Sequence, residues 1–362
     1  MKKIITISTF LSVTLLLQAT IRTVSNVPST LAQYNTIQAA IDASSSGDTV
    51  YVHGSPTAYS SFTINGKKVA VIGPGWAPNK NLPLTVSVPG MTISGAGASG
   101  TEIHGLVVTS TIDITTSHPD NLRFIRNYFS CGQLIYVAQG STTYIGYLFE
   151  GNIFDNSYIA ATGSSNYQNF LFQNNYFYGS ANCVTTQVNG FTNSINVLFN
   201  HNLFFGPSSS VVDIFGSNCN FLALTNNIFV HRNAASQNSL STFNNNITYY
   251  PNATAPSDPW SVNGNVNSGG NVSNQNPQMA AQAGVNAGTD NALADYTIAA
   301  GPANNSGSDG KDMGLLYDAT GSLNWTTSRT SRLPFIYSMN ITNPTIPQAG
   351  TLNVQVEARK NN

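Results

Sequence analysis

Charged residues are scarce in this chain: they make up 8% of its 362 residues, with 14 lysines and arginines against 15 aspartates and glutamates. A typical globular chain carries about three times that share. Because the net charge is −1, there is no basic field to attract nucleic acid, and we expect no nucleic-acid partner. Solubility must depend on uncharged polar residues such as asparagine, serine and threonine.

Cysteine is also scarce, with three residues at positions 131, 183 and 219. An odd number excludes complete intramolecular pairing. We interpret Cys131, Cys183 and Cys219 as small buried hydrophobic residues. A single Cys183–Cys219 disulfide is the alternative.

The apolar run that opens the chain, from Ile4 to Leu17, has no counterpart of similar length further along. Two lysines precede it and small or polar residues follow it, which is typical of a secretory signal. The run is short for a membrane-spanning helix and is interrupted by threonine and serine. We therefore expect residues 1–20 to be a signal peptide. The mature chain would then be secreted or held at the cell surface, with no membrane span.

One octapeptide frame is repeated through the middle of the chain. Its copies are LRFIRNYF (122–129), YLFEGNIF (147–154), FLFQNNYF (170–177), VLFNHNLF (197–204), LALTNNIF (222–229) and the degraded STFNNNIT (241–248). One asparagine recurs in this frame, at Asn127, Asn152, Asn175, Asn202, Asn227 and Asn246. The steps between these positions, by subtraction, are 25, 23, 27, 25 and 19 residues. Such a period indicates a solenoid in which each repeat is one stacked unit.

Apolar and polar residues alternate in short bursts on either side of the recurring asparagine, which is the period of a β-strand. A repeat of this length has no room for a helix of ten residues, which argues against leucine-rich, ankyrin and tetratricopeptide arrays. Three short strands and three turns fit, and they predict an all-β fold, a right-handed parallel β-helix. The asparagines should then form a hydrogen-bonded ladder, with aromatic columns stacked inside the coils about 4.8 Å apart.

The flanking segments predict how the solenoid begins and ends. Thr36–Ala43 is a short amphipathic helix that would cover the open end of the first coil. The strand-like runs Phe335–Thr342 and Thr351–Ala358 predict a C-terminal hairpin packed on the solenoid.

We therefore divide the mature chain into a β-helix over residues 21–318, with its clearest coils over 100–250, and a C-terminal tail over 319–362. Four residues before the ladder position, side chains should point outward. There, Leu148, Leu171 and Leu198 would form an exposed apolar stripe. Our hypothesis is that the C-terminal strands or a long loop cover it.

Three stretches outside the repeats carry a resemblance to a known group. They are TIQAAIDASSSGDTVYVHGSPTAY (36–59), FTINGKKVAVIGPGW (62–76) and YTIAAGPANNSGSDGKDMG (296–314). Together with the asparagine repeats, they resemble secreted right-handed β-helix proteins of the pectin-lyase-like superfamily. That group includes polysaccharide lyases, polygalacturonases, tailspike depolymerases and non-catalytic adhesins. The resemblance implies the fold and an extracellular polysaccharide as partner, but no particular chemistry.

No complete catalytic site is recognisable in the sequence. Polygalacturonase-like hydrolysis needs clustered carboxylates, yet there is no Asp-Asp pair, and the carboxylates of region 121–250 occupy different phases of the repeat. A metal-free lyase needs a cation and a base such as tyrosine, histidine or arginine. The catalytic candidates that remain are Arg126, Glu150, His201 and Asp213, and the substrate-binding candidates are Tyr136, Tyr158, Gln173 and Asn200.

Each candidate also has a structural interpretation. Arg126 and Glu150 fall on adjacent coils, where a surface ion pair is worth under about 1 kcal/mol. His201 is expected to be an outward polar residue in an asparagine-rich column. Asp213 is flanked by apolar residues and either projects into a groove or is a buried, hydrogen-bonded carboxylate.

Asp309 and Asp312 flank a Gly-Lys turn and are candidate calcium ligands. We expect them to cap the turn instead, because two carboxylates are fewer than calcium usually collects. We expect no cofactor.

Two classes of function remain. The sequence favours a binding or surface protein, whose faces of asparagine, glutamine, serine, threonine and tyrosine would contact an extracellular polysaccharide or a cell-surface glycan. The alternative is a polysaccharide lyase or, less favoured, a glycoside hydrolase of the pectin-lyase-like type.

Overall fold

A computed structural model describes residues 19–76, 84–114, 117–130, 134–137, 142–161, 165–180, 186–208, 212–317, 325, 335–341, 351 and 354–359. For residues 134–137, 335–341 and 358–359 the backbone alone is described. Most of the expected signal peptide, residues 1–18, therefore lies outside the described residues, as do Cys131 and Cys183. Cys219 is a buried free thiol whose Sγ lies 3.4 Å from the Val188 carbonyl oxygen.

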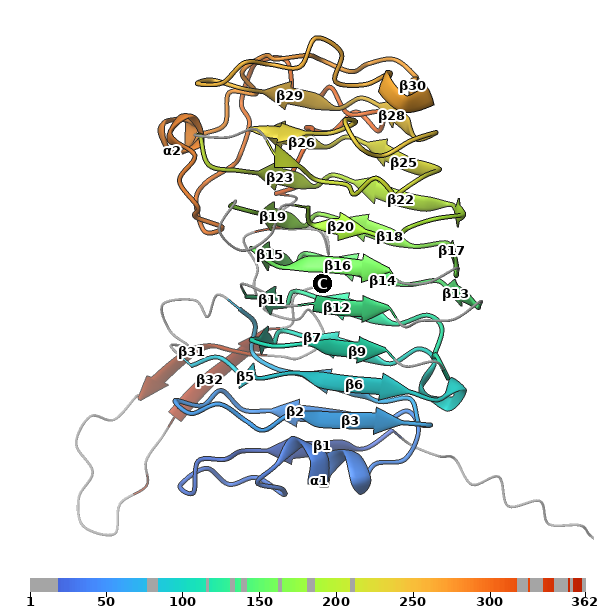
Figure 1. Ribbon diagram of the computed structural model, residues 1–362. Helices are drawn as coiled ribbons and strands as arrows, with labels where there is room; N and C mark the ends of the chain where they lie inside the picture. Colours follow the sequence, from blue (N-terminus) through green and yellow to red (C-terminus); the bar gives the residue numbers. More distant parts are fainter. Residues whose placement is uncertain are drawn as a thin grey trace, which may run out of the picture.

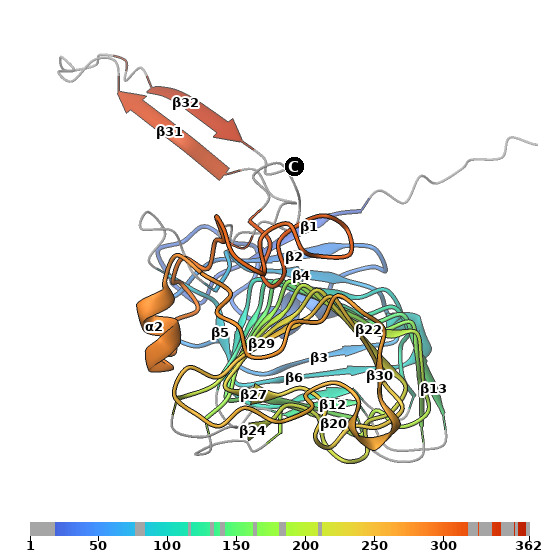
Figure 2. The ribbon, with the colours of Figure 1, turned by 90° about the horizontal axis from the view of Figure 1, so that it is seen from above.

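The described chain is a solenoid of parallel strands stacked coil upon coil (Figure 1), which confirms the predicted fold class. Seen from above, the coils superpose, and their sides are three parallel sheets (Figure 2). Each strand pairs with strands of the coils below and above it, so residues at equivalent repeat positions stand in columns.

The first sheet has 11 strands in the described part of the chain. They are β1 (Ile21–Val24), β2 (Thr49–Val52), β4 (Ala70–Ile72), β7 (Glu102–His104), β10 (Arg123–Ile125), β14 (Leu148–Glu150), β18 (Leu171–Gln173), β22 (Val197–Asn200), β25 (Leu222–Thr225), β28 (Thr242–Asn244) and β30 (Val266–Asn267).

The second sheet follows the ladder position of each coil, which is an asparagine from Asn127 onward. Its described strands are β5 (Ser87–Val88), β8 (Val107–Val108), β11 (Tyr128–Phe129), β15 (Ile153–Asp155), β19 (Tyr176–Tyr178), β23 (Leu203–Phe205), β26 (Ile228–Val230) and β29 (Ile247–Tyr249).

The third sheet lies on the near side of the molecule in Figure 1. Its described strands are β3 (Phe62–Asn65), β6 (Met91–Ser94), β9 (Ile112–Ile114), β12 (Leu134–Val137), β16 (Tyr158–Ala161) and β20 (Val188–Asn189).

Shorter elements complete the coils. Two small parallel sheets contain β13 (Thr143–Ile145), β17 (Asn166–Gln168) and β21 (Ser194–Ile195), and β24 (Val212–Asp213) and β27 (Arg232–Asn233). The helices of the described residues are α1 (Ile37–Asp42) and α2 (Gln282–Ala287), with 3₁₀ turns η1 (Ala96–Ala98) and η2 (Val262–Gly264). Helix α2 was not predicted. Gly288 caps its C-terminus with a φ of 67°, a conformation that suits glycine.

The turn between the first and second sheets sets the positions of several candidate residues. The residue immediately before the ladder asparagine has a positive φ in every repeat: Arg126, Gly151, Asn174, His201, Asn226 and Asn245. Glycine and asparagine adopt this conformation most readily, which explains why they recur in the column. Arginine and histidine are the exceptions.

The recurring asparagines form one continuous hydrogen-bonded stack, buried in every coil from Asn127 to Asn246. From Asn152 onward, each Oδ1 accepts from the main-chain N–H and from Nδ2 of the ladder asparagine one coil earlier, at 2.8–3.2 Å. Each Nδ2 also donates to a main-chain carbonyl; for Asn152 this is the carbonyl of Phe124, at 2.9 Å. The stack extends one coil further than the sequence indicated, to Asn271.

The predicted aromatic columns are confirmed. Three residues before the ladder, Phe124, Phe149, Phe172 and Phe199 stack with ring centroids 4.3–5.0 Å apart. Two residues after it, Phe129, Phe154, Phe177, Phe204 and Phe229 stack at 4.4–4.9 Å. All are fully buried, so these columns are the centre of the hydrophobic core.

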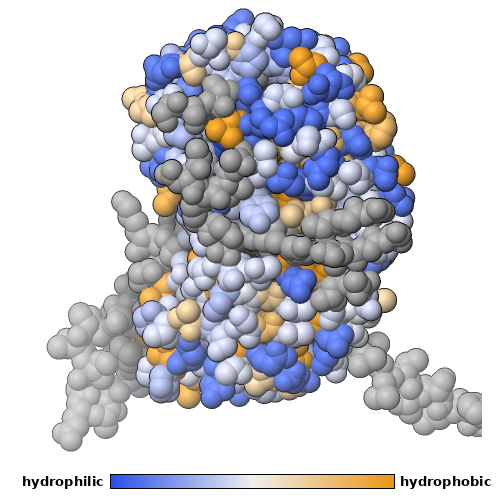
Figure 3. All heavy atoms as spheres, in the orientation of Figure 1, coloured by the Kyte–Doolittle hydropathy of each residue, from blue (hydrophilic) through white to orange (hydrophobic). Residues whose placement is uncertain are grey.

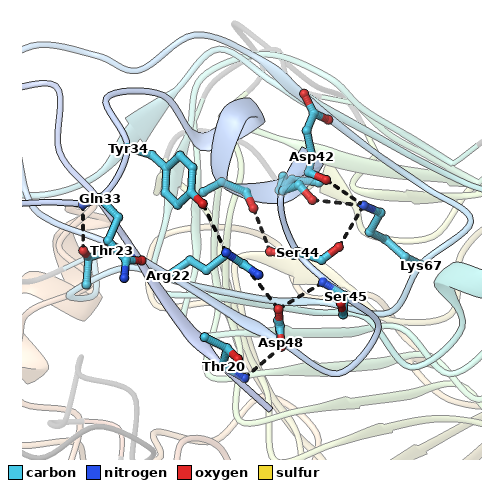
Figure 4. Close-up of polar contacts among 12 residues, drawn as sticks. Thr20, Arg22, Thr23, Gln33, Tyr34, Asp42, Ser44, Ser45, Asp48 and Lys67 are labelled. Atoms are coloured by element: carbon cyan, nitrogen blue, oxygen red, sulfur yellow. Dashed lines mark hydrogen bonds and ion pairs between the residues drawn. The ribbon is translucent and has the colours of Figure 1, made fainter. Parts of the chain in front are cut away.

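Polar contacts fix helix α1 at the N-terminal end of the solenoid (Figure 4). Thr36 Oγ1 accepts from the Ala39 N–H at 3.2 Å at its start, as expected for an N-cap. Lys67 Nζ donates to the carbonyls of Ile41 (3.1 Å) and Ser44 (3.0 Å) at its end, where the helix dipole favours a cation. That α1 covers the open end of the first coil stays a prediction.

Asp48 ties the first two coils together (Figure 4). Its carboxylate accepts from the main-chain N–H groups of Thr20 (2.8 Å) and Ser45 (3.0 Å) and from Arg22 Nε (3.3 Å). Burial alone would raise the pKa of Asp48, but these hydrogen bonds outweigh burial and lower it. The carboxylate is therefore held ionised inside the N-terminal coil.

A long C-terminal segment, residues 276–317, packs on the second sheet; we call it the strap. Its apolar residues Met279, Tyr296, Met313 and Leu315 join a second hydrophobic cluster with the outward-facing residues of β15, β19, β23 and β26. Our hypothesis placed such a cover over Leu148, Leu171 and Leu198 of the first sheet. Those leucines are half-buried, but the strap's apolar cluster lies on the neighbouring face.

The tail contains the expected pair of strands, β31 (Phe335–Ile341) and β32 (Val354–Arg359), which are antiparallel. Residues 354–357 of β32 are exposed. Its packing against the solenoid stays a prediction.

Candidate functional site

The outer face of the third sheet has a row of mostly polar residues running along the solenoid. The register places Thr63, Thr92, Asp113, Tyr136, Ala160 and Asn189 side by side on successive strands. Their neighbours Ile64, Ile93, Ile112 and Ile159 point into the core and are fully buried. Because strand side chains alternate, the row lies on the outer surface.

The row begins at a hollow of about 360 Å³ over the first coils. Its polar lining includes Gln38, Thr63, Thr92, Ser110 and Asp113. Hydroxyl, amide and carboxylate groups therefore meet around one open depression, with donors and acceptors of several kinds.

A second hollow, of about 420 Å³, lies at the other end of the row. Thr186, Asn189, Asp213, Asn218 and Gln237 contribute its polar lining. Asp213, which the sequence indicated as the oddest charge in the repeats, stands at the edge of this hollow on β24.

Three side chains donate hydrogen bonds to the Asp213 carboxylate. They are Asn233 Nδ2 at 3.0 Å, Gln237 Nε2 at 2.6 Å and Ser236 Oγ. Asp213 is half-buried, so it combines both interpretations from the sequence: it is hydrogen-bonded, and it borders a groove.

A third hollow, of about 380 Å³, continues the face one coil further. Asn233, Ser236, Ser257, Asp258 and Asn263 are among its lining residues. Asp258 Oδ1 accepts from the N–H groups of Trp260 and Ser261, both at 2.9 Å, and these bonds lower the pKa of Asp258. The upper part of this side is mainly hydrophilic in Figure 3.

Two tyrosine candidates fall on this face of the sheet. Tyr136 stands at a register position of the row, between Asp113 and Ala160; its side chain lies outside the described residues. Tyr158 on β16 is half-buried and aligns with Leu134, two positions away from the row.

Glu150, Gln173 and Asn200 lie on the first sheet, not on the third. They are paired in register on β14, β18 and β22, and Gln173 Nε2 donates to Glu150 Oε2 at 2.6 Å. Asn200 Oδ1 accepts from Thr225 Oγ1 at 2.9 Å. The structure therefore brings these candidates together with one another but not with Asp213.

Arg126 and His201 are buried, which corrects the expectation of surface positions. Arg126 is 6% exposed, and burial lowers the pKa of its guanidinium while the nearby Glu150 charge partly opposes this. His201 is 1% exposed, because the strap lies over the turn column that contains it.

Asp309 and Asp312 act within the strap. Asp309 Oδ1 accepts from the Lys311 N–H at 3.2 Å, and Asp312 Oδ1 accepts from the Asn305 N–H at 2.8 Å. Asp309 Oδ2 also contacts His201 Nε2 at 3.1 Å. Among the described residues, no group of three or more histidine, cysteine, aspartate or glutamate side chains is placed to hold a metal ion.

A carboxyl pair that the sequence did not indicate joins the strap to the second sheet. Asp155 on β15 and Asp290 after α2 share a hydrogen bond. Tyr128 donates to Asp155 at 2.5 Å, and Tyr176 to Asp290 at 3.0 Å. Asp290 is exposed as a residue, but its carboxyl group turns inward, where loss of water and the Asp155 charge raise the pKa of Asp290 to about 6.

Beside this pair lies an aromatic hollow of about 320 Å³, lined by Trp76, Tyr317 and Trp325 with strap residues that include Leu293 and Asp295. The two tryptophan rings are 5.4 Å apart and almost completely buried, so they chiefly fasten the strap.

No helix in the described parts of the chain is long and apolar enough to cross a membrane. Comparison with protein-family models and with curated proteins finds no match to this chain.

Proposed function

We propose that this chain is a secreted β-helix protein that binds extracellular polysaccharide along the outer face of its third sheet. The observation that carries the proposal is the alignment of three polar hollows along one face, one at the start of the polar row and two at its other end. Asparagine, glutamine, serine and threonine side chains there present both donors and acceptors, as sugar hydroxyl groups require. A chain of sugar residues would lie parallel to the solenoid axis.

The same proposal includes a relationship to the pectin-lyase-like superfamily and the export of the protein. The lysine-led apolar run of residues 1–17 and the three resembling stretches support them. The parallel β-helix agrees with the resemblance, but a shared fold does not specify an activity.

A lyase or a glycoside hydrolase is the less supported alternative. Glycoside hydrolases separate their two carboxyl groups by roughly 5 to 9.5 Å, whereas Asp155 and Asp290 are close enough to share a hydrogen bond. In the hollow that contains Asp213, the described lining residues include no second carboxylate, histidine or arginine. Binding without chemistry therefore fits the geometry better.

The test uses the purified chain from residue 19 onward and a panel of neutral, amino-sugar and uronic-acid polysaccharides. We expect pull-down with one or more insoluble glycans, with no unsaturated product by ultraviolet absorbance and no new reducing ends. Asp213→Asn and Thr92→Ala should weaken binding, whereas Thr242→Ala, an exposed threonine on the first sheet, should not. Failure to bind any glycan would contradict the proposal.

Asp295→Asn is the matched control for the aromatic hollow. If it weakens binding and Asp213→Asn does not, the ligand lies under Trp76 and Trp325, and the third sheet is not the binding face. New absorbance or new reducing ends would favour the enzymatic alternative.

A further inference from the structure

The charge of the third-sheet face restricts which polysaccharide it accepts. Each of the three hollows has one carboxylate in its lining: Asp113, Asp213 and Asp258. None of the described lining residues is a lysine or an arginine. The residues between 115 and 211 that lie outside the described residues include no charged residue in the sequence.

Arg232, next in sequence to the lining residue Asn233, and Lys67, four residues after the lining residue Thr63, are engaged elsewhere. Arg232, close enough for Asp213 to affect the pKa of its guanidinium, is fully buried and donates inward to the carbonyls of Gly179 and Phe205. Lys67 is bound to carbonyl oxygens at the end of α1. A carboxylate ligand on the face would therefore meet one aspartate in each hollow and no lysine or arginine among the described lining residues to bind it.

We infer that the face takes a polysaccharide of amino sugars with free ammonium groups, and not a uronic acid polymer. The inference rests on the proposed function and adds the ligand class to it. Aspartates carry negative charge at neutral pH, and the hydrogen bonds to Asp258 hold it in that form. Ammonium groups along one sugar chain would approach Asp113 at the start of the row and Asp213 and Asp258 at its other end, while amide and hydroxyl groups bind the ring hydroxyls.

The experiment measures the affinity of the chain for three oligosaccharides of equal length. They are a glucosamine oligomer, its N-acetylated form, which keeps the ring and removes the charge, and a galacturonic acid oligomer, which reverses the charge. We expect affinity to fall in that order, and added salt to weaken binding of the amine form alone. Because the net charge is −1, attraction by the protein as a whole contributes little.

The variants Asp113→Asn, Asp213→Asn and Asp258→Asn should each weaken binding of the amine oligomer about two- to fivefold, the usual range for exposed charge pairs. They should leave the N-acetylated oligomer within about twofold. Asp295→Asn, on the strap, should change neither. Circular dichroism of each variant checks that the fold is intact.

Two failures are distinguishable. If the galacturonic acid oligomer binds as well as the amine form, or if the triple variant keeps the full preference for the amine, the inference is wrong while the binding function stands. If none of the three oligomers binds and no polysaccharide of the panel binds either, the proposed function itself is wrong.

Discussion

Nε2 of His201 lies 3.1 Å from Oδ2 of Asp309, although 108 residues separate the two in sequence. His201 occupies the left-handed turn position before the ladder, and Asp309 belongs to the strap. Two further strap N–H groups, those of Ser308 and Leu316, donate to Asn226 and Asn174 in the same column, both at 2.7 Å. The turn column is thus the line along which the strap is fastened.

The burial of His201 beneath the strap predicts a weaker strap at acid pH. Burial lowers the pKa of His201, with Asp309 partly opposing, so the folded state favours the neutral imidazole. The stabilisation is present above the ordinary value of 6.5 and is lost as pH falls below it. The protection of the Ser308 and Leu316 amides against hydrogen exchange, corrected for the intrinsic rate, should decrease below pH 6.5.

His201→Asn should remove that pH dependence, because asparagine suits the positive φ and does not titrate. Lys311→Arg, an exposed substitution in the same turn that keeps the positive charge near His201, is the control and should behave as the parent chain. If His201→Asn still loses amide protection in the strap below pH 6.5, another group controls the strap.

The carboxyl pair Asp155–Asp290 predicts the opposite trend for the part of the strap near α2. Because the pKa of Asp290 is raised from 3.8 to about 6, its stabilisation is complete below pH 3.8 and is lost as pH rises through about 6. Asp290→Asn mimics the protonated carboxyl group. The protection of amides 289–298 against hydrogen exchange, corrected for the intrinsic rate, should then become independent of pH between 4 and 8. Asp295→Asn should keep the pH dependence of the parent chain.

The asparagine ladder predicts a large loss of stability when one member is removed. Asn152→Ala leaves Asn127 Nδ2, the Asn127 N–H and the Phe124 carbonyl without their partner in a buried site. We expect a loss of about 3 kcal/mol in the free energy of unfolding, measured in urea. Asn166→Ala, half-buried with one long side-chain bond of 3.5 Å, is the control and should lose under about 0.5 kcal/mol. Equal losses would mean that the stack does not stabilise the coils.

A second left-handed column, six residues before the ladder, predicts a stabilising substitution. It contains Asn169 and Asn196, but the next coil places Phe221 there, with a φ of 56° and half of its surface exposed. A bulky side chain pays about 1 kcal/mol for this conformation. Phe221→Asn should raise the melting temperature, and Phe221→Ala, which removes the same surface but keeps the strain, should not. A lower melting temperature for Phe221→Asn would indicate that the ring packs more than its exposure suggests.

The coil architecture followed from the sequence because it depends on local periodicity. Phe172 and Phe177 lie in the alternating pattern around Asn175, and stacking identical patterns buries them all without any further information. Helix α1, with Thr36 as its N-cap, was likewise encoded in adjacent residues. The last ladder member, Asn271, was missed because its coil lacks the flanking aromatic residues that marked the others.

The sites depended on tertiary structure, because they join residues whose separation no repeat period describes. Asp155 and Asp290 meet only because the strap returns along the second sheet, and His201 is buried for the same reason. The linings of the three hollows combine residues of different coils, so Asp113, Asp213 and Asp258 share a face without sharing a repeat position. The sequence by itself determined how each coil closes on the next, and the path of the chain between coils decided which side chains meet.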